Sequence, residues 1–211
     1  MASKTFAVFD LDSTKNQDME VLILSNLLEK KYNSVTVLDL NVGAHNSFLK
    51  DVAWKKVDQI SQAKVFDLTS YQLWDNEALN ANKIVNSISS LADKNEILII
   101  NPNYNKHKVN EEPLQNIDNL LVFVKVKNNI TTHILNFLLA HTFKNKNIFI
   151  FVTGYDHNMQ NQKEIVALKK QFKGSNFLIE TINKIPNFKS LEDIESIDPW
   201  LEIYKKLQMI F

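Results

Sequence analysis

The sequence predicts an α/β fold in which helices cover both faces of a parallel β-sheet. The strongest observation is the run Ile-Leu-Ile-Ile at residues 97–100, which has no polar alternation and is typical of a strand buried on both faces. A helical pattern that ends at Ala92 leads into this run, and a polar turn that contains Pro102 follows it. Such a sequence indicates parallel pairing, because the connection between parallel strands is usually a helix.

Four further segments of the chain have the composition of strands, and helical patterns alternate with them. The predicted strands lie at residues 5–9, 35–39, 96–101, 147–152 and 176–182. The predicted helices lie at residues 17–31, 77–92, 163–172 and after Asp198-Pro199. Residues 41–76 are less regular, with a helix expected around 48–60, and residues 120–126 fit either a helix or a strand. We therefore predict a single flavodoxin-like domain, residues 1–211, with three layers and a five-stranded parallel sheet.

Composition limits the functions that the sequence allows. The formal net charge is zero, so no overall field draws the chain to nucleic acid or to an anionic membrane, and neither is expected as a partner. The chain has no cysteine, which excludes disulfides and thiolate chemistry. No apolar run approaches the roughly 20 residues of a membrane helix, and the amino terminus lacks the pattern of a signal peptide, so we expect a cytoplasmic protein. Only three glycines are present, although phosphate-binding loops usually depend on them.

Four short segments carry a resemblance to a known family. They are Val-Thr-Val-Leu-Asp-Leu-Asn at 35–41, the strand and turn at 92–105 with Pro113-Leu114 and Ile117-Asp118 after them, the strand and glycine turn at 144–154, and Phe172-Lys173-Gly174. In order and spacing they resemble the FMN-dependent NADH azoreductases, formerly called acyl-carrier-protein phosphodiesterases. The resemblance covers nearly the whole chain. It implies a homodimer in which NADH or NADPH reduces FMN, and FMN then reduces a quinone or an azo compound.

The resemblance also implies that FMN is held at the carboxyl ends of the strands. Its phosphate would lie on the first loop and the start of the first helix, at Ser13, Thr14, Lys15, Asn16 and Gln17. Its ring system would lie between two turns, formed by Pro102, Asn103, Tyr104 and Asn105 and by Thr153, Gly154 and Tyr155. No catalytic side chain and no metal ligand is assigned, because the flavin itself carries the hydride chemistry.

The first loop also supports two alternatives. Residues 10–14 form the pattern Asp-x-Asp-x-Thr after an apolar strand. This pattern resembles the first motif of haloacid-dehalogenase-type phosphatases, which implies Asp10 as nucleophile, Asp12 as general acid and base, and bound Mg²⁺. The other alternative is a non-catalytic flavodoxin-like relative that has lost FMN, because carboxylates surround this loop and glycines are missing from it. Both aspartates also fit a local role as caps of the loop and of the first helix.

Overall fold

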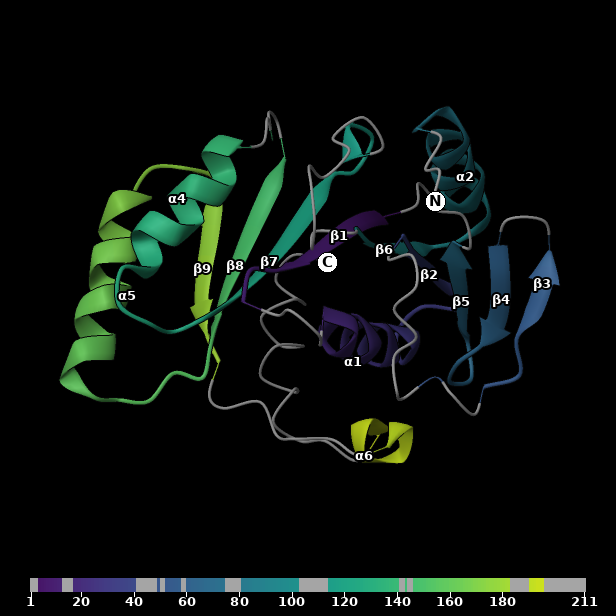
Figure 1. The fold of residues 1–211 in the computed structure, drawn as a ribbon, viewed down its shortest axis with the longest axis horizontal. Helices are drawn as coiled ribbons and strands as arrows, with labels where there is room; N and C mark the ends of the chain where they lie inside the picture. The colour runs from purple at the N-terminus through teal and green to yellow at the C-terminus, as the bar shows by residue number, and fades with distance from the viewer. Residues whose placement is uncertain are drawn as a thin grey trace.

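A single mixed sheet organises the protein. The structure, a computed structural model, describes residues 4–12, 17–40, 49, 52–57, 60–74, 81–102, 114–140, 143, 146–182 and 190–195. Its strands are β1 (Lys4–Asp10), β2 (Val35–Asp39), β3 (Lys55–Val57), β4 (Ile60–Lys64), β5 (Thr69–Trp74), β6 (Ile97–Asn101), β7 (Asn119–Lys125), β8 (Asn147–Thr153) and β9 (Phe177–Thr181). Its helices are α1 (Gln17–Glu29), α2 (Ala81–Lys94), α4 (Ile130–Ala140), α5 (Met159–Gln171) and α6 (Leu191–Glu195). These nine strands of the described residues pair in the order β3-β4-β5-β2-β6-β1-β7-β8-β9 (Figure 1).

The parallel part of the sheet is centred on β1. Thr5 of β1 pairs with Leu98 of β6, and Val8 pairs with Leu121 of β7, both in parallel register. Every neighbouring pair from β5 to β9 is parallel, whereas β3 and β4 pair antiparallel with each other and with β5. The carboxyl ends of β6, β1, β7 and β8 therefore lie along one edge, which we call the carboxyl edge.

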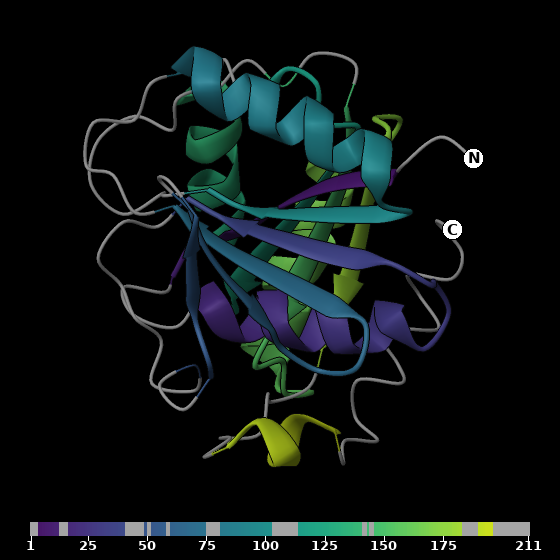
Figure 2. The same cartoon turned by 90° about the vertical axis from the view of Figure 1, so that its right-hand side faces the viewer.

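Helices cover both faces of the sheet. α1 lies on one face with α6 beyond it, and α2, α4 and α5 lie on the other face (Figures 1 and 2). Successive side chains of β1 pack on alternate faces of the sheet, because neighbouring side chains of a strand point to opposite sides. Phe6 and Val8 pack in the core under α1, and Ala7 and Phe9 pack in the core under the opposite helices.

The strands are apolar without interruption because both faces are buried. All five residues of β6 are buried, and so are six of the seven residues of β7. The helices, by contrast, need only one apolar face. In α2 the buried residues Ile84 and Ile88 lie four positions apart, so they form one stripe that faces the sheet. The α/β class could be predicted from the sequence because continuous apolar runs mark the strands and one-sided apolar patterns mark the helices.

The predicted size and type of the sheet are wrong: it has nine strands and is mixed, where five parallel strands were expected. The reason lies in the irregular region. Residues expected to form a helix around 48–60 contribute β3 and the start of β4 in an antiparallel ladder, with Lys56 opposite Ser61 and Val57 opposite Ile60. Residues 120–126, which fitted either state, belong mainly to β7. All five strands predicted from apolar runs are present.

Two predicted helices and the predicted single domain remain to be compared with the structure. The helix expected at 163–172 is confirmed as α5, which begins at Met159. The helix expected after Asp198-Pro199 lies outside the described residues. Whether the chain forms one domain over residues 1–211 stays a prediction. None of the described helices has both the length and the apolar character needed to cross a membrane.

Candidate functional site at the carboxyl edge

The connection from β1 to α1 occupies the middle of the carboxyl edge. In parallel α/β sheets ligands bind beyond the carboxyl ends of the strands, so this connection is the first place to look for a functional site. It begins with Leu11, which is buried and whose backbone N–H donates to the carbonyl of Phe123 in β7 over 2.9 Å. Asp10 then folds back on the connection, since its carboxylate accepts the backbone N–H of Asp12 at 3.0 Å. Asp10 therefore has the local capping role that an aspartate commonly takes in a turn.

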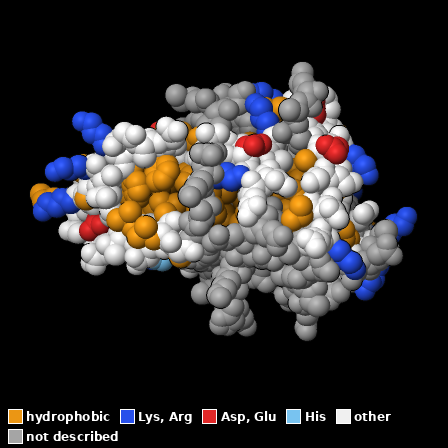
Figure 3. Space-filling view, turned by 90° about the horizontal axis from the view of Figure 1, so that it is seen from above, with side chains coloured by type: hydrophobic (Ala, Val, Ile, Leu, Met, Phe, Trp, Pro, Cys, Tyr) orange, Lys and Arg blue, Asp and Glu red, His pale blue; other side chains and the backbone are white. Residues whose placement is uncertain are grey.

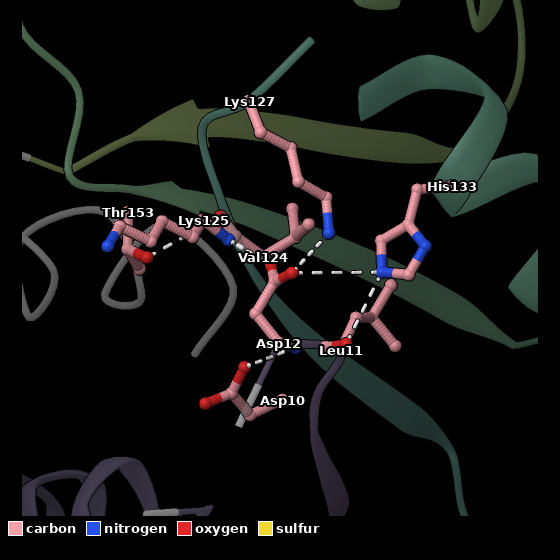
Figure 4. A network of polar contacts seen from close by, with 8 residues as sticks. All are labelled: Asp10, Leu11, Asp12, Val124, Lys125, Lys127, His133 and Thr153. Carbon is pink, nitrogen blue, oxygen red and sulfur yellow. Dashed lines mark hydrogen bonds and ion pairs between the residues drawn. The ribbon is translucent and has the colours of Figure 1, made fainter. Parts of the chain in front are cut away.

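Asp12 ties the β1–α1 connection to the end of β7 (Figure 4). Its Oδ2 accepts the backbone N–H of Lys125 at 2.6 Å, and its Oδ1 forms an ion pair with the Nζ of Lys127. His133 of α4 lies beside the same carboxylate, with its Nε2 3.9 Å from Oδ1 of Asp12 and 3.3 Å from the carbonyl oxygen of Leu11. We call these groups of Asp12, Lys125, Lys127 and His133 the Asp12 clamp.

The turn after β8 lies next to the clamp on the same edge. The carbonyl of Thr153 accepts the backbone N–H of Val126 at 2.9 Å, so this turn is held against the strand that carries the clamp. Gly154 has φ +67°, a left-handed conformation that disfavours a side chain. Tyr155 donates its backbone N–H to Ile182 at 3.2 Å, and its ring packs edge-on against His157. The turn thus closes the edge at its β8 end.

The structure assigns positions to five of the twelve sequence-predicted cofactor residues. Pro102 is buried directly after β6, and Thr153, Gly154 and Tyr155 follow or end β8. Two strands, β1 and β7, separate these two groups, which corresponds to about 14 Å at the usual strand spacing. Gln17 is the first described residue of α1. The other predicted positions lie outside the described residues: Ser13, Thr14, Lys15, Asn16, Asn103, Tyr104 and Asn105.

Sequence reasoning missed three members of the clamp: Lys125, Lys127 and His133. The available signal was the alternation Val-Lys-Val-Lys at 124–127 directly after a buried run, which marks basic groups at a strand end. His133 gave no signal, because it lies more than a hundred residues from Asp12 in the chain and shares no motif with it. None of these three residues could be connected with Asp12 without knowing that β7 lies beside β1.

Comparisons with known proteins identify the class of fold. A scan against protein-family models found no match, and a search of curated proteins found no significant relative. A putative plasmid partition protein from Borrelia burgdorferi, bound to AMPPNP, has a TM-score of 0.64 at 17% identity, covering 97% of this chain and 99% of that chain. pNOB8 ParA bound to nonspecific DNA has a TM-score of 0.67 at 10% identity, covering 98% of both chains. The MinC:MinD cell division complex of Aquifex aeolicus has a TM-score of 0.66 at 10% identity, covering 96% of this chain and 90% of that chain.

The fold is therefore an α/β fold with a mixed, mostly parallel sheet that resembles ParA and MinD ATPases. This finding overturns the resemblance to FMN-dependent azoreductases. Apolar strands that are fed by helices and end in polar turns occur in every parallel α/β protein, so those segments carried the architecture and not the family. The predictions that depended on this resemblance are therefore wrong as well. They are the oxidoreductase activity, the quinone or azo substrate and the flavin-bearing homodimer.

The cofactor and partner predictions are corrected by the same structures. FMN with NADH or NADPH was expected, but a neighbour of this fold holds the adenine nucleotide analogue AMPPNP. Nucleic acid was excluded on the ground of zero net charge, but another neighbour is bound to nonspecific DNA. Zero net charge was a poor guide because it averages over the whole surface. The haloacid-dehalogenase-type phosphatase and the FMN-free flavodoxin relative fit the neighbours no better.

The sequence of the β1–α1 connection does not match the phosphate-binding pattern of a P-loop ATPase. P-loop ATPases place the pattern G-x-x-x-x-G-K-[ST] between a strand and a helix: backbone N–H groups hold the phosphates, and the hydroxyl and a further aspartate hold Mg²⁺. With Lys15 at the lysine of this pattern, the glycine positions are taken by Phe9 and Thr14, and the hydroxyl position by Asn16. Phe9 is fully buried within β1.

The strand ends at this edge differ in charge. β6 ends at Asn101, a neutral amide, whereas β1 and β2 end in the carboxylates of Asp10 and Asp39. Over the described ranges, no group of three or more His, Asp or Glu side chains could hold a metal ion. The glycine-rich pattern is thus absent from the sequence of the β1–α1 connection, and the Asp12 clamp lies at the described start of that connection.

Proposed function

We propose that the protein acts in DNA partition, as a ParA-type protein that binds DNA without sequence preference. The observation that carries the proposal is the agreement of nearly the whole chain with pNOB8 ParA bound to nonspecific DNA, at a TM-score of 0.67. The plasmid partition protein from Borrelia burgdorferi supports the same function, with 97% of this chain covered. We propose no ATP hydrolysis step, because the sequence of the β1–α1 connection lacks the glycines of the P-loop pattern.

The surface of α5 supports DNA as the partner. Ile165 and Leu168 face the sheet and are buried, so the opposite side of the helix faces solvent. The lysines of α5 and of the residues just after it are all exposed: Lys163 and Lys170 on this solvent side, Lys169 at the border of the buried stripe, and Lys173 after the helix. The helix contains a single acidic residue, Glu164, which is half-buried. We call these four lysines the α5 lysine face.

The α5 lysine face lies at one end of the molecule, where lysine side chains project around α5 (Figure 3). Lysines that contact DNA phosphates release counterions, which produces affinity without sequence preference. Such a local face acts on DNA even in a chain whose charges sum to zero, because exposed charges are screened over about 10 Å at moderate salt. The α5 lysine face therefore supplies the chemistry that nonspecific DNA binding requires.

The experiment that tests the proposal is fluorescence anisotropy with labelled double-stranded DNA of two unrelated sequences, over a range of salt concentrations. We expect equal affinity for both sequences and a steep loss of affinity with salt. In Lys169→Gln/Lys170→Gln the slope of log K against log salt should become shallower by about 1.8, since each lost phosphate contact contributes about 0.9.

The matched control is Lys30→Gln/Lys64→Gln, which removes two exposed lysines outside α5. It should leave the salt slope unchanged. Absence of DNA binding by the unaltered protein at low salt, or an equal loss in the control, would contradict the proposal.

A further inference from the structure

We infer that Asp12, at the start of the β1–α1 connection, is a built-in anion: its carboxylate takes up the donors at the end of β7, so that the edge is not arranged to receive a nucleotide phosphate. The inference rests on the proposed function, because it takes the carboxyl edge as the place where a ParA-type protein would hold its nucleotide. It explains how a chain with this fold dispenses with the glycine-rich loop. The class of ligand that the edge rejects is the nucleoside triphosphate with its metal ion.

The groups that converge on Asp12 are of the kinds that bind anions. The backbone N–H of Lys125 donates to Oδ2 at 2.6 Å, and the ammonium group of Lys127 pairs with Oδ1. Free backbone N–H groups and lysine side chains are the usual anion donors at such an edge. Here they are already engaged by a carboxylate of the same chain.

The clamp differs from a simple ion pair in having a backbone partner. The side chain of Asp12 is 21% exposed, against 42% for Lys127. Its two oxygens have different partners, and one of them is a backbone N–H that cannot move away without disturbing the end of β7. The clamp therefore joins residues 113 positions apart in the chain and fixes Asp12 to the end of β7.

Negative charge on the connection adds to this effect. Asp10 and Asp12 both lie at the start of the β1–α1 connection, and the carboxylate of Asp10 is directed to the backbone of Asp12. A phosphate group at the start of this connection would meet two carboxylates, and like charges at short range repel unless a metal ion bridges them. Asp12 is already paired with Lys127, which competes with such a metal ion for its carboxylate. Lys15 is the one basic residue of segment 11–16, so the segment does not balance that repulsion.

The direct test is binding of MgATP and MgADP to the unaltered protein, measured by equilibrium dialysis and by the melting temperature. A ligand that binds the folded state raises the melting temperature. We expect neither nucleotide to be retained and no rise at millimolar concentration. Retention of either nucleotide, or a rise in melting temperature, would overturn the inference.

A second test addresses the clamp itself through the variants Asp12→Asn, Lys127→Met and the double variant. Asp12→Asn should lower the melting temperature by about 2–4 °C, the usual shift for a chain of this length when one such contact is lost. The same change should have a smaller effect in the Lys127→Met background, because the two side chains interact. Asp67→Asn, which alters an exposed aspartate elsewhere, should change nothing. Equal effects of Asp12→Asn in both backgrounds would contradict the clamp.

The two proposals fail in distinguishable ways. If DNA binding is absent and MgATP does not bind, the proposed function fails and the inference stands. If DNA binds and MgATP raises either the DNA affinity or the melting temperature, the function stands and the inference fails. If the proposed function and the inference are both correct, the protein binds DNA and MgATP does not change that binding.

Discussion

Asp39 is a carboxylate at the carboxyl end of β2 that is almost fully buried. The hydroxyl of Tyr71, which is also buried, donates to its Oδ2 at 2.7 Å. Removal of this donor in Tyr71→Phe leaves a buried carboxyl group with one hydrogen bond fewer. We expect the free energy of unfolding to fall by about 1–3 kcal/mol, the usual cost of removing the partner of a buried acceptor, measured by urea denaturation.

The control for this prediction is Tyr155→Phe. Tyr155 keeps its ring contact with His157 after the change, and its side chain is only partly buried. Its effect should stay within about 0.5 kcal/mol. A similar loss in both variants would mean that the hydrogen bond of Tyr71 is not the cause.

Gly154 occupies a backbone conformation that other residues avoid. An added Cβ would meet the Cγ of Lys125 at 3.7 Å, which is ordinary contact, so any cost comes from φ +67° and not from crowding. Gly154→Ala should lower the free energy of unfolding by about 1–2 kcal/mol. Gly154→Asn should cost less, because asparagine tolerates the left-handed region. Thermal unfolding of both variants measures the difference, and equal costs would contradict this explanation.

At the scale of single residues the sequence directed attention to the β1–α1 connection but did not predict the contacts made there. The position of Asp10 and Asp12 after the first strand indicated a functional connection, and a capping role for Asp10 was one of the alternatives it left open. The partners of Asp12 could not be predicted, because Lys125 and Lys127 become neighbours only when β7 pairs with β1. Local patterns contain no information on that pairing.

At the scale of elements, α5 shows how one side chain fixes the start of a helix. Asn158 precedes the helix, and its Oδ1 accepts the backbone N–H of Asn161 at 2.8 Å. Asn158→Ala should reduce the free energy of unfolding by about 1 kcal/mol, whereas Asn158→Ser should retain most of the stability, because serine also caps helices. Chemical denaturation followed by circular dichroism checks this difference. Equal stability of the alanine and serine variants would contradict the cap.

The elements that the sequence predicted best are those with the most uniform burial. Residues 97–100 and 148–152 are buried throughout, so a continuous apolar run marked each strand. β4 has only one fully buried residue, Ala63, and its polar composition gave no strand signal. The helix expected around 48–60 was therefore wrong for a physical reason: an antiparallel ladder beside β5 stabilises residues whose own preference is weak.

At the scale of the whole molecule, the sheet separates two cores. Ile23 of α1 belongs to the core on one face, and Ile134 of α4 belongs to the core on the other. Ile23→Val and Ile134→Val should each cost about 0.5–1.5 kcal/mol. Because they share no partner, their effects in the double variant should add to within about 0.5 kcal/mol, as measured by urea denaturation.

A pair within one core provides the contrast. The rings of Phe9 and Phe137 lie 5.1 Å apart between centroids, in an edge-to-face arrangement. The effects of Phe9→Leu and Phe137→Leu should therefore not add, since each variant already removes the contact between the rings. Additivity for this pair, or coupling between the two isoleucines, would contradict the separation of the cores.

The class of fold could be predicted from the sequence, but the sheet order could not. Buried strands alternating with helices predict parallel pairing, and seven neighbouring strands from β5 to β9 have it. The order in which they pair depends on crossovers between segments far apart in the chain. Azoreductases and ParA-type proteins share the alternation, and the order of strands separates them only once the structure is known.

The strand β3 has a consequence for how the protein behaves at high concentration. An interior as apolar as that of β6 and β7 would be a hazard if the sheet could recruit further chains. The sheet ends at β3 with three residues, two of them the exposed Lys55 and Lys56. So short and charged a border gives an incoming strand few hydrogen-bonding partners and places ammonium groups in its path. We therefore expect this border to disfavour fibre-like assembly of the sheet along this side.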